Sequence, residues 1–279
     1  MSFAPLLPAT GVTGYKLLVA TEARQREVFD RQPAIARDIA YFTENIGNVE
    51  TPADLIADRK LLRVALGAFG LDDEINKGAF LRKILEEGSE DPEAFANRLV
   101  DPRYVNFTRA FGFGDIGGAR TGLTSFPAEI TDAYRERQFE IAVGDQNESL
   151  RLALNFRREI KTYATMADPE NTAWLSLLGD RPTRAVIEGA FGLPQDFGQL
   201  DVDRQRAVLQ EKNLRDFGSK SLDVFLDDAN VELAITKYLA RQSILEGPSP
   251  TTPGATALTL LSFSSFGLGQ QGFQNLLNS

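Results

Sequence analysis

Apolar residues recur at spacings of three, four and seven positions along most of the chain. Three windows show this pattern most clearly: 127–143, 148–164 and 229–245. Because an α-helix turns once in about 3.6 residues, such spacing places apolar side chains on one buried face. The stripes consist of Ile130, Ala133, Tyr134 and Ile141; of Leu150, Ala153, Leu154, Phe156, Ile160 and Tyr163; and of Val231, Ala234, Ile235, Tyr238 and Leu245. No segment alternates with a period of two, and Leu outnumbers Val and Ile together. We therefore predict an all-α fold, a compact body of about ten helices.

Helix starts carry a repeated signal, in which a capping residue precedes proline. The pairs are Thr51-Pro52, Asp91-Pro92, Asp101-Pro102 and Asp168-Pro169. The Thr or Asp side chain can accept a hydrogen bond from the first turn, where proline's missing N–H costs nothing. Each pair predicts a helix beginning at that point.

Helix ends carry a second signal, the pentapeptide Gly-Ala-Phe-Gly-Leu at 67–71, which recurs identically at 189–193. A variant, Ala-Phe-Gly-Phe, occupies 110–113. Glycine followed by an apolar residue is typical of a Schellman ending, in which glycine takes the left-handed conformation. We predict that Gly70, Gly112 and Gly192 end three helices. The identical pentapeptides further suggest that the body consists of two related helical halves.

Composition shifts divide the chain into four parts. We expect a flexible N-terminal segment at 1–16, a first helical half at 17–123 and a second at 124–247, followed by a linker and an apolar tail at 248–279. The glycine-rich stretch 112–122 is predicted to connect the halves flexibly. It lacks the Gly-Lys-Ser/Thr ending of a phosphate loop.

The C-terminal tail is unusual for an acidic protein, because residues 257–277 hold nine large apolar side chains and no charge. A Pro/Gly/Thr-rich linker precedes it, so the tail could dock on its own body or on another protomer or partner. Exposure of such a segment favours association. We predict a partner-binding role for Leu260, Phe263, Phe266, Leu268 and Phe273.

The overall composition excludes several kinds of chemistry. The 279 residues contain 30 Lys+Arg and 39 Asp+Glu, a net charge of −9, and neither His nor Cys. Catalysis by Ser-His-Asp or Cys-His, disulfides, and zinc sites built on His or Cys are therefore excluded. Net negative charge argues against nucleic-acid binding. We expect no metal and no cofactor.

Carboxylate pairs are the remaining candidates for catalysis. Glu129 with Asp132, Glu136 with Glu140, and Asp227 with Asp228 have helical or adjacent spacing, and Glu148-Ser149 resembles the catalytic pair of lytic transglycosylases only superficially. Arg135 and Arg137 beside Glu136 and Glu140 indicate an ion-paired surface instead. With no polar set expected to converge in a cleft, we predict that the protein is not an enzyme.

The N-terminus shows no leader pattern. It lacks a basic start, and Pro5, Pro8 and Gly11 interrupt the apolar residues. We expect synthesis in the cytoplasm, no cleaved signal peptide and no membrane insertion.

Several phrases together resemble an uncharacterised alphaproteobacterial family whose members are often encoded with flagellar genes and sometimes labelled flagellar basal-body rod proteins. The phrases, spread over roughly 30–245, are Tyr41-Phe42-x-x-Asn45-Ile46, Asp54-Leu55-x-x-Asp58, Ala68-Phe69-Gly70-Leu71, Phe95-Ala96-Asn97-Arg98-Leu99-x-Asp101-Pro102-Arg103-Tyr104, Tyr134-x-x-x-Gln138-Phe139-Glu140, Ala142-Val143-Gly144, Leu152-Ala153-Leu154 and Gly192-Leu193-Pro194. The family has no established catalytic residues to carry over. The resemblance implies a structural or assembly protein at the bacterial flagellum or basal body, acting through protein–protein contacts with flagellar proteins or its own protomers. Glycines 267, 269 and 272 interrupt the heptads expected of an axial rod protein. Two alternatives stay open: a carboxylate-dependent hydrolase, for example on peptidoglycan, and a cytoplasmic adaptor unrelated to flagella.

Overall fold

The secondary structure is entirely helical over residues 4–246, the part of the chain that the computed structural model describes. This confirms the all-α prediction. The α-helices are α1 (Gly11–Asp30), α2 (Pro33–Asn45), α3 (Pro52–Ala57), α4 (Arg59–Phe69), α5 (Gly78–Glu87), α6 (Pro102–Phe111), α7 (Phe126–Gly144), α8 (Glu148–Ala164), α9 (Thr172–Gly179), α10 (Arg181–Phe191), α11 (Val202–Phe217) and α12 (Asp228–Glu246). Short 3₁₀ helices lie between them: η1 (Ile46–Asn48), η2 (Asp72–Asn76), η3 (Phe95–Arg98), η4 (Gln195–Gln199) and η5 (Leu222–Leu226).

Two of the four predicted helix starts coincide with real caps. Thr51 forms a capping box with Asp54 at the start of α3, and Asp101 accepts the Arg103 N–H at the start of α6. Asp168-Pro169 lies in a turn before α9, which begins at Thr172, and no α-helix begins at Asp91-Pro92. The Asn97 amide donates to the carbonyls of residues 89 and 91 instead and holds this segment as a loop.

Both identical pentapeptides end their helices as full Schellman motifs. Gly70 has φ +67°, and Leu71 N–H donates to Leu66 O at 2.9 Å. Gly192 has φ +63°, and Leu193 N–H donates to Glu188 O at 3.0 Å. Gly112, with φ +68°, ends α6 by a simpler motif, a single bond from its N–H to the carbonyl of residue 108.

The first glycine of each pentapeptide has a different role, close helix packing. A Cβ atom at Gly67 would lie 2.8 Å from the ring of Tyr134 on α7. A Cβ atom at Gly189 would lie 2.5 Å from the ring of Tyr238 on α12. Both tyrosines are buried. Each pentapeptide therefore lets a tyrosine ring lie directly on the helix backbone.

An arginine three residues after each tyrosine completes the contact. Arg137 Nε donates to Ala68 O at 2.8 Å, and Arg241 donates to Ala190 O. These carbonyls lie at the negative ends of α4 and α10, where a cation is favoured. We call this Tyr-x-x-Arg contact with the helix end the helix-end lock.

The repeat also extends upstream of the pentapeptides. The Tyr41 hydroxyl donates to Asp58, which precedes α4, and the Tyr163 hydroxyl donates to Asp180, which precedes α10. Both pairs are 17 residues apart in sequence, and both aspartates stand at the same distance from their pentapeptide. The two halves therefore share a tyrosine, an N-terminal aspartate, a helix and its end.

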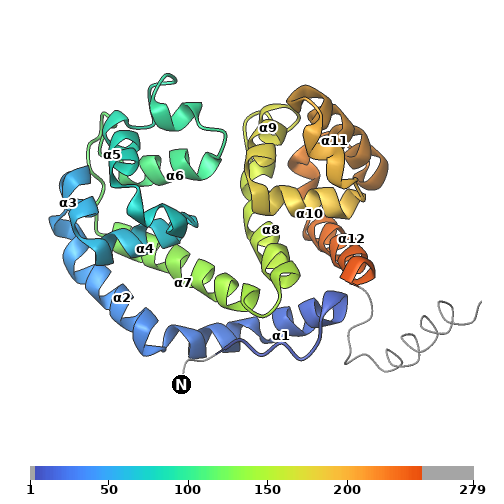
Figure 1. Cartoon of the computed structure of the whole chain (residues 1–279), viewed down its shortest axis with the longest axis horizontal. Coiled ribbons are helices and arrows are strands. Elements are labelled where there is room, and N and C mark those ends of the chain that lie inside the picture. The colour runs from blue at the N-terminus through green and yellow to red at the C-terminus, as the bar shows by residue number, and fades with distance from the viewer. Residues whose placement is uncertain (1–3, 247–279) are drawn as a thin grey trace, which may run out of the picture.

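Two groups of helices, α2–α6 and α8–α12, lie on opposite sides of the molecule, with α1 and α7 running between them (Figure 1). Helix α7 packs on α4 of one group and on α8 of the other, and the buried apolar side chains form one contiguous cluster. The Tyr15 hydroxyl on α1 donates to Glu232 on α12. Helix α6 and the loop after it have no counterpart between α11 and α12.

Three expectations differ from what the structure shows, and two of them concern segments expected to be flexible. Helix α1 begins at Gly11, inside the segment 1–16, and Leu6 N–H donates to Gln25. The glycine-rich stretch 112–122 is anchored, because the buried Asp115 accepts hydrogen bonds from Ser89 and Thr121 donates to Val49 O.

The third difference concerns the ends of the predicted stripes. Leu245 is 77% exposed, while the other four members of its stripe are buried. Ala133 and Ile141 are half-buried because they line the cleft described below. The partner-binding residues predicted in the tail, Leu260, Phe263, Phe266, Leu268 and Phe273, lie outside the described residues.

Replacing Gly70 or Gly192 by alanine is expected to lower the free energy of unfolding by about 1 kcal/mol or more, because an L-residue strains a left-handed backbone. Chemical denaturation measures the change. Gly47→Ala is the matched control, since it has no positive φ and a Cβ there meets nothing within 4 Å. Equal stabilities of all three variants would contradict the assignment of the helix ends.

Candidate functional site

A cleft of about 790 Å³ lies between the two groups of helices. It is lined by the end of α4 and the start of η2, the first turn of α6, one face each of α7 and α8, and the start of α10. Its charged members are Asp72, Asp73, Arg103, Glu136, Arg137, Glu140, Arg151, Arg158, Glu159, Asp180 and Arg181. This corrects the expectation that no polar set converges in a cleft.

Ion pairs between α7 and α8 form the floor of the cleft. Arg158 holds Glu140 through two hydrogen bonds of 2.9 Å each. Glu159 accepts hydrogen bonds from both Arg137, at 2.6 Å, and Arg158. Because Glu140 is only 4% exposed, its charge depends on this bidentate partner.

Arginines also close one wall of the cleft on the end of α4. Arg137 donates to Ala68 O as part of the helix-end lock, and Arg103 donates to Gly70 O while it pairs with Asp101. Both guanidinium groups therefore satisfy carbonyls that the helix leaves free. These N–H donors are therefore already engaged in hydrogen bonds within the fold.

The opposite wall contains a buried carboxyl, Asp180. Its Oδ2 accepts hydrogen bonds from Tyr163 at 3.0 Å and Thr183 at 2.5 Å. Burial raises the pKa of Asp180 above its ordinary value despite these bonds. Burial and the charges of Asp180 and Glu159 also raise the pKa of Tyr163, so this phenol stays protonated and acts as a donor.

A second acidic group with a raised pKa lies at the α4 end of the cleft. Burial raises the pKa of Asp72, which accepts a long hydrogen bond of 3.4 Å from Gln138. Carboxyl groups that hold a proton at higher pH can act as general acids. Among residues 4–246, no three carboxylates gather in a way that could hold a metal ion.

Of the carboxylates singled out in the sequence, Glu136 and Glu140 both line the cleft, where they lie 3.9 Å and 2.9 Å from Arg158, and the others are not among its lining residues. Glu140 is buried with Arg158 of a neighbouring helix, so the expectation that it belongs to an ion-paired surface is wrong. The others are placed as follows: Glu129 is exposed, Asp132 pairs with Arg135 at 2.5 Å, Glu136 lies 3.4 Å from Arg26, Glu148 pairs with Arg151, Asp227 caps α12 and Asp228 pairs with Lys161 at 2.5 Å.

Sequence reasoning did not single out Arg103, Arg158, Glu159 or Asp180. Asp180 had a detectable signal, since Asp-Arg stands at the same distance before both pentapeptides, at 58–59 and 180–181. The spacing Tyr-x-x-Arg at 134–137 and 238–241 is a second signal. The pairing of Arg158 with Glu140 had none, because it depends on how α7 and α8 meet.

The family described as "Protein of unknown function (DUF1217)" matches residues 68–229, more than half of the chain. The chain belongs to this family. The matched range contains every residue that lines the cleft. No curated protein matches.

One solved structure supports the fold. The crystal structure of protein AGR_C_984 from Agrobacterium tumefaciens, a structural-genomics target, is 28% identical in sequence, with a TM-score of 0.71. The similarity covers 88% of this chain and 100% of the other.

Replacing Arg158 by alanine is expected to cost about 3–5 kcal/mol of unfolding free energy, because it leaves the buried Glu140 without its partner. Arg151→Ala, on the same helix, is the matched control. Its partner Glu148 is 59% exposed, so this change should cost at most about 1 kcal/mol. Urea titrations of both variants make the comparison, and equal losses would contradict the structural role of the buried pair.

Stability in acid is expected to depend on Glu159. Burial raises its pKa, but the positive charges of Arg158 and Arg137 outweigh burial, so its net pKa is lowered. The contribution of ionised Glu159 to the free energy of unfolding is thus complete above the ordinary pKa of about 4.5. It is lost as pH falls through the lowered value. Glu159→Gln should flatten the dependence of unfolding free energy on pH between about 5 and 3, relative to wild type.

The control for this measurement is Glu129→Gln, at an exposed position on α7. Asp72, whose raised pKa acts in the opposite direction, does not depend on Glu159 and cancels in the comparison. Parallel curves for wild type and Glu159→Gln would refute the assignment.

Proposed function

We propose that the protein is a non-catalytic structural or assembly component associated with the bacterial flagellum, which acts through contacts with other proteins. One observation carries the non-catalytic part. Arg137 in the cleft and Arg241 outside it make the same contact with a helix end. A contact that is repeated by a residue outside the cleft is explained by the fold.

The other charged groups of the cleft support this interpretation. Arg158 and Glu140 satisfy each other, and Asp180 accepts from two hydroxyl groups that fix its position. Catalysis needs a group that is free to meet a substrate. The flagellar part of the proposal stands on the sequence phrases alone.

The tail is the proposed contact with partners, because residues 257–277 combine nine large apolar side chains with no charge. Deleting 248–279 is expected to leave the helical body folded and monomeric, since the described core consists of residues between 15 and 239. Partner capture and motility should both be lost. Pull-downs from motile cells with full-length and truncated protein, together with circular dichroism, measure these effects.

The matched control replaces Leu260, Phe263, Phe266, Leu268 and Phe273 by serine at constant length. If partner binding depends on apolar contact, this variant should behave like the deletion. A truncated protein that unfolds or aggregates would show that the tail belongs to the core and would contradict the proposal.

The competing hydrolase hypothesis is best tested at Asp72 and Asp180, the two cleft carboxyls with raised pKa values. We expect Asp72→Asn and Asp180→Asn, singly and together, to retain motility. The enzyme hypothesis would be favoured if a folded variant lost motility completely and also lost a cell-wall digestion activity that the wild-type protein shows.

A further inference from the structure

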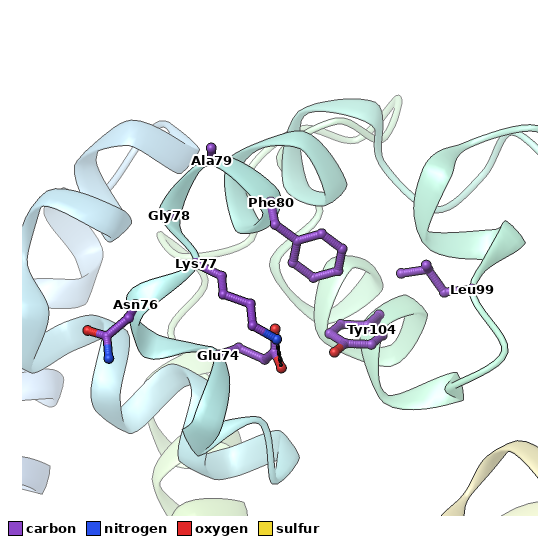
Figure 2. A pocket seen from close by; sticks show the side chains of 8 residues that line it. All are labelled: Glu74, Asn76, Lys77, Gly78, Ala79, Phe80, Leu99 and Tyr104. Atoms are coloured by element: carbon purple, nitrogen blue, oxygen red, sulfur yellow. Dashed lines mark hydrogen bonds and ion pairs between the residues drawn. The ribbon is translucent and has the colours of Figure 1, made fainter.

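A second pocket, of about 590 Å³, lies away from the cleft between η2, α5 and α6. Figure 2 shows Phe80, Leu99 and Tyr104 converging on one side of it, while Asn76 points away. The rings of Phe80 and Tyr104 meet edge to face, with centroids 5.2 Å apart. The pocket therefore has an apolar and aromatic wall that is open to solvent.

A buried carboxylate lies at the base of this wall. Glu74 is only 8% exposed, and within residues 4–246 its Oε2 has no hydrogen-bond partner. Its Oε1 accepts from Lys77 Nζ at 2.9 Å (Figure 2). Burial, the nearby negative charge of Glu74 and a hydrogen bond between the phenol and that carboxylate raise the pKa of Tyr104 to about 12. A buried carboxylate oxygen without a partner is costly and needs an explanation.

Lys77 does not provide that explanation, because it lies mostly in solvent. Its side chain is 59% exposed, against 10% for that of Glu74. An exposed lysine pair contributes little free energy and exchanges readily. Lys77 therefore covers the carboxylate without fixing it.

The second half of the molecule shows that the repeat does not require this burial. Asp196 in η4 stands at the same position relative to its pentapeptide as Glu74, and Asp196 is exposed. The difference is α6, which contributes Tyr104 and is preceded by Leu99, and which has no counterpart in the second half. The pocket lies where this additional helix covers a repeated element.

We propose that this pocket binds one basic side chain of a partner protein, with the cation on Glu74 and its alkyl stem against Phe80, Leu99 and Tyr104. A guanidinium or ammonium group supplies a charge-assisted hydrogen bond to Oε2, the oxygen that Lys77 does not contact. The stem is apolar, as the wall is, and aromatic faces attract cations. The incoming group displaces Lys77, whose ammonium occupies the same carboxylate. The inference rests on the proposed function only in that the ligand belongs to a protein.

The test uses the full chain and a small probe, N-acetyl-arginine methylamide, followed by backbone amide NMR shifts. We expect saturable shifts centred on residues 74–80 and 99–104. The citrulline analogue, which has the same shape without the charge, should bind about tenfold more weakly or not at all. The lysine analogue distinguishes a general cation site from one specific for guanidinium, and either result supports the site.

Two variants give opposite expected results. Glu74→Gln should weaken probe binding about tenfold or more, whereas Lys77→Ala should strengthen it by removing the competing cation. Asp196→Asn, at the equivalent exposed position, should change nothing. Equal binding of the arginine and citrulline probes, or unchanged binding in Glu74→Gln, would overturn the proposal. Probe binding at this pocket is measured independently of the tail deletion. Failure of the pocket proposal is therefore distinguishable from failure of the proposed partner-binding function of the tail.

Discussion

The contact between an arginine and the carbonyls of a left-handed helix end is the interaction on which both halves depend. Glycine at positions 70 and 192 turns the chain, and glycine at 67 and 189 admits the tyrosine ring of the neighbouring helix. Arginine then satisfies a carbonyl that the ending helix leaves free. Loss of any one part would leave a buried ring without space or a carbonyl without a partner. This mutual dependence explains why the five residues recur unchanged while their surroundings differ.

The cleft follows from the way in which the halves diverge. In the first half, Asp58 caps its helix by accepting the N–H groups of Lys60 and Leu61. In the second half, proline stands at 182 and offers no N–H, and Asp180 accepts the Thr183 hydroxyl in place of backbone N–H groups, while its bond from Tyr163 matches the bond from Tyr41 to Asp58. Burial raises the pKa of Asp180, whereas the bonds to Asp58 lower its pKa more than burial raises it. Burial, without backbone N–H groups on the carboxylate, thus gives the wall of the cleft a carboxyl with a raised pKa.

The sequence was sufficient to predict local features and insufficient to predict where helices meet. Caps, helix ends and apolar stripes depend on residues within one or two turns, and so Thr51, Gly70 and Gly192 could be placed correctly. The pairing of Glu140 with Arg158 depends on the packing of two helices, so spacing along one helix suggested the wrong partner. A longer search for self-similarity would have found Asp58 and Asp180, because these residues stand at equal distances from an identical pentapeptide.

Repetition also separates the parts of the molecule that the fold explains from those that it does not. A feature present in both halves, such as the helix-end lock, is needed to build the unit and says little about a ligand. A feature present in one half requires a cause of its own. Glu74 is such a feature, since it is buried while its equivalent Asp196 is solvated. The additional helix α6 converts a solvated acidic position into a buried carboxylate beside aromatic rings. Because a buried carboxylate oxygen without a hydrogen bond costs free energy, a cation placed on Oε2 would stabilise this arrangement.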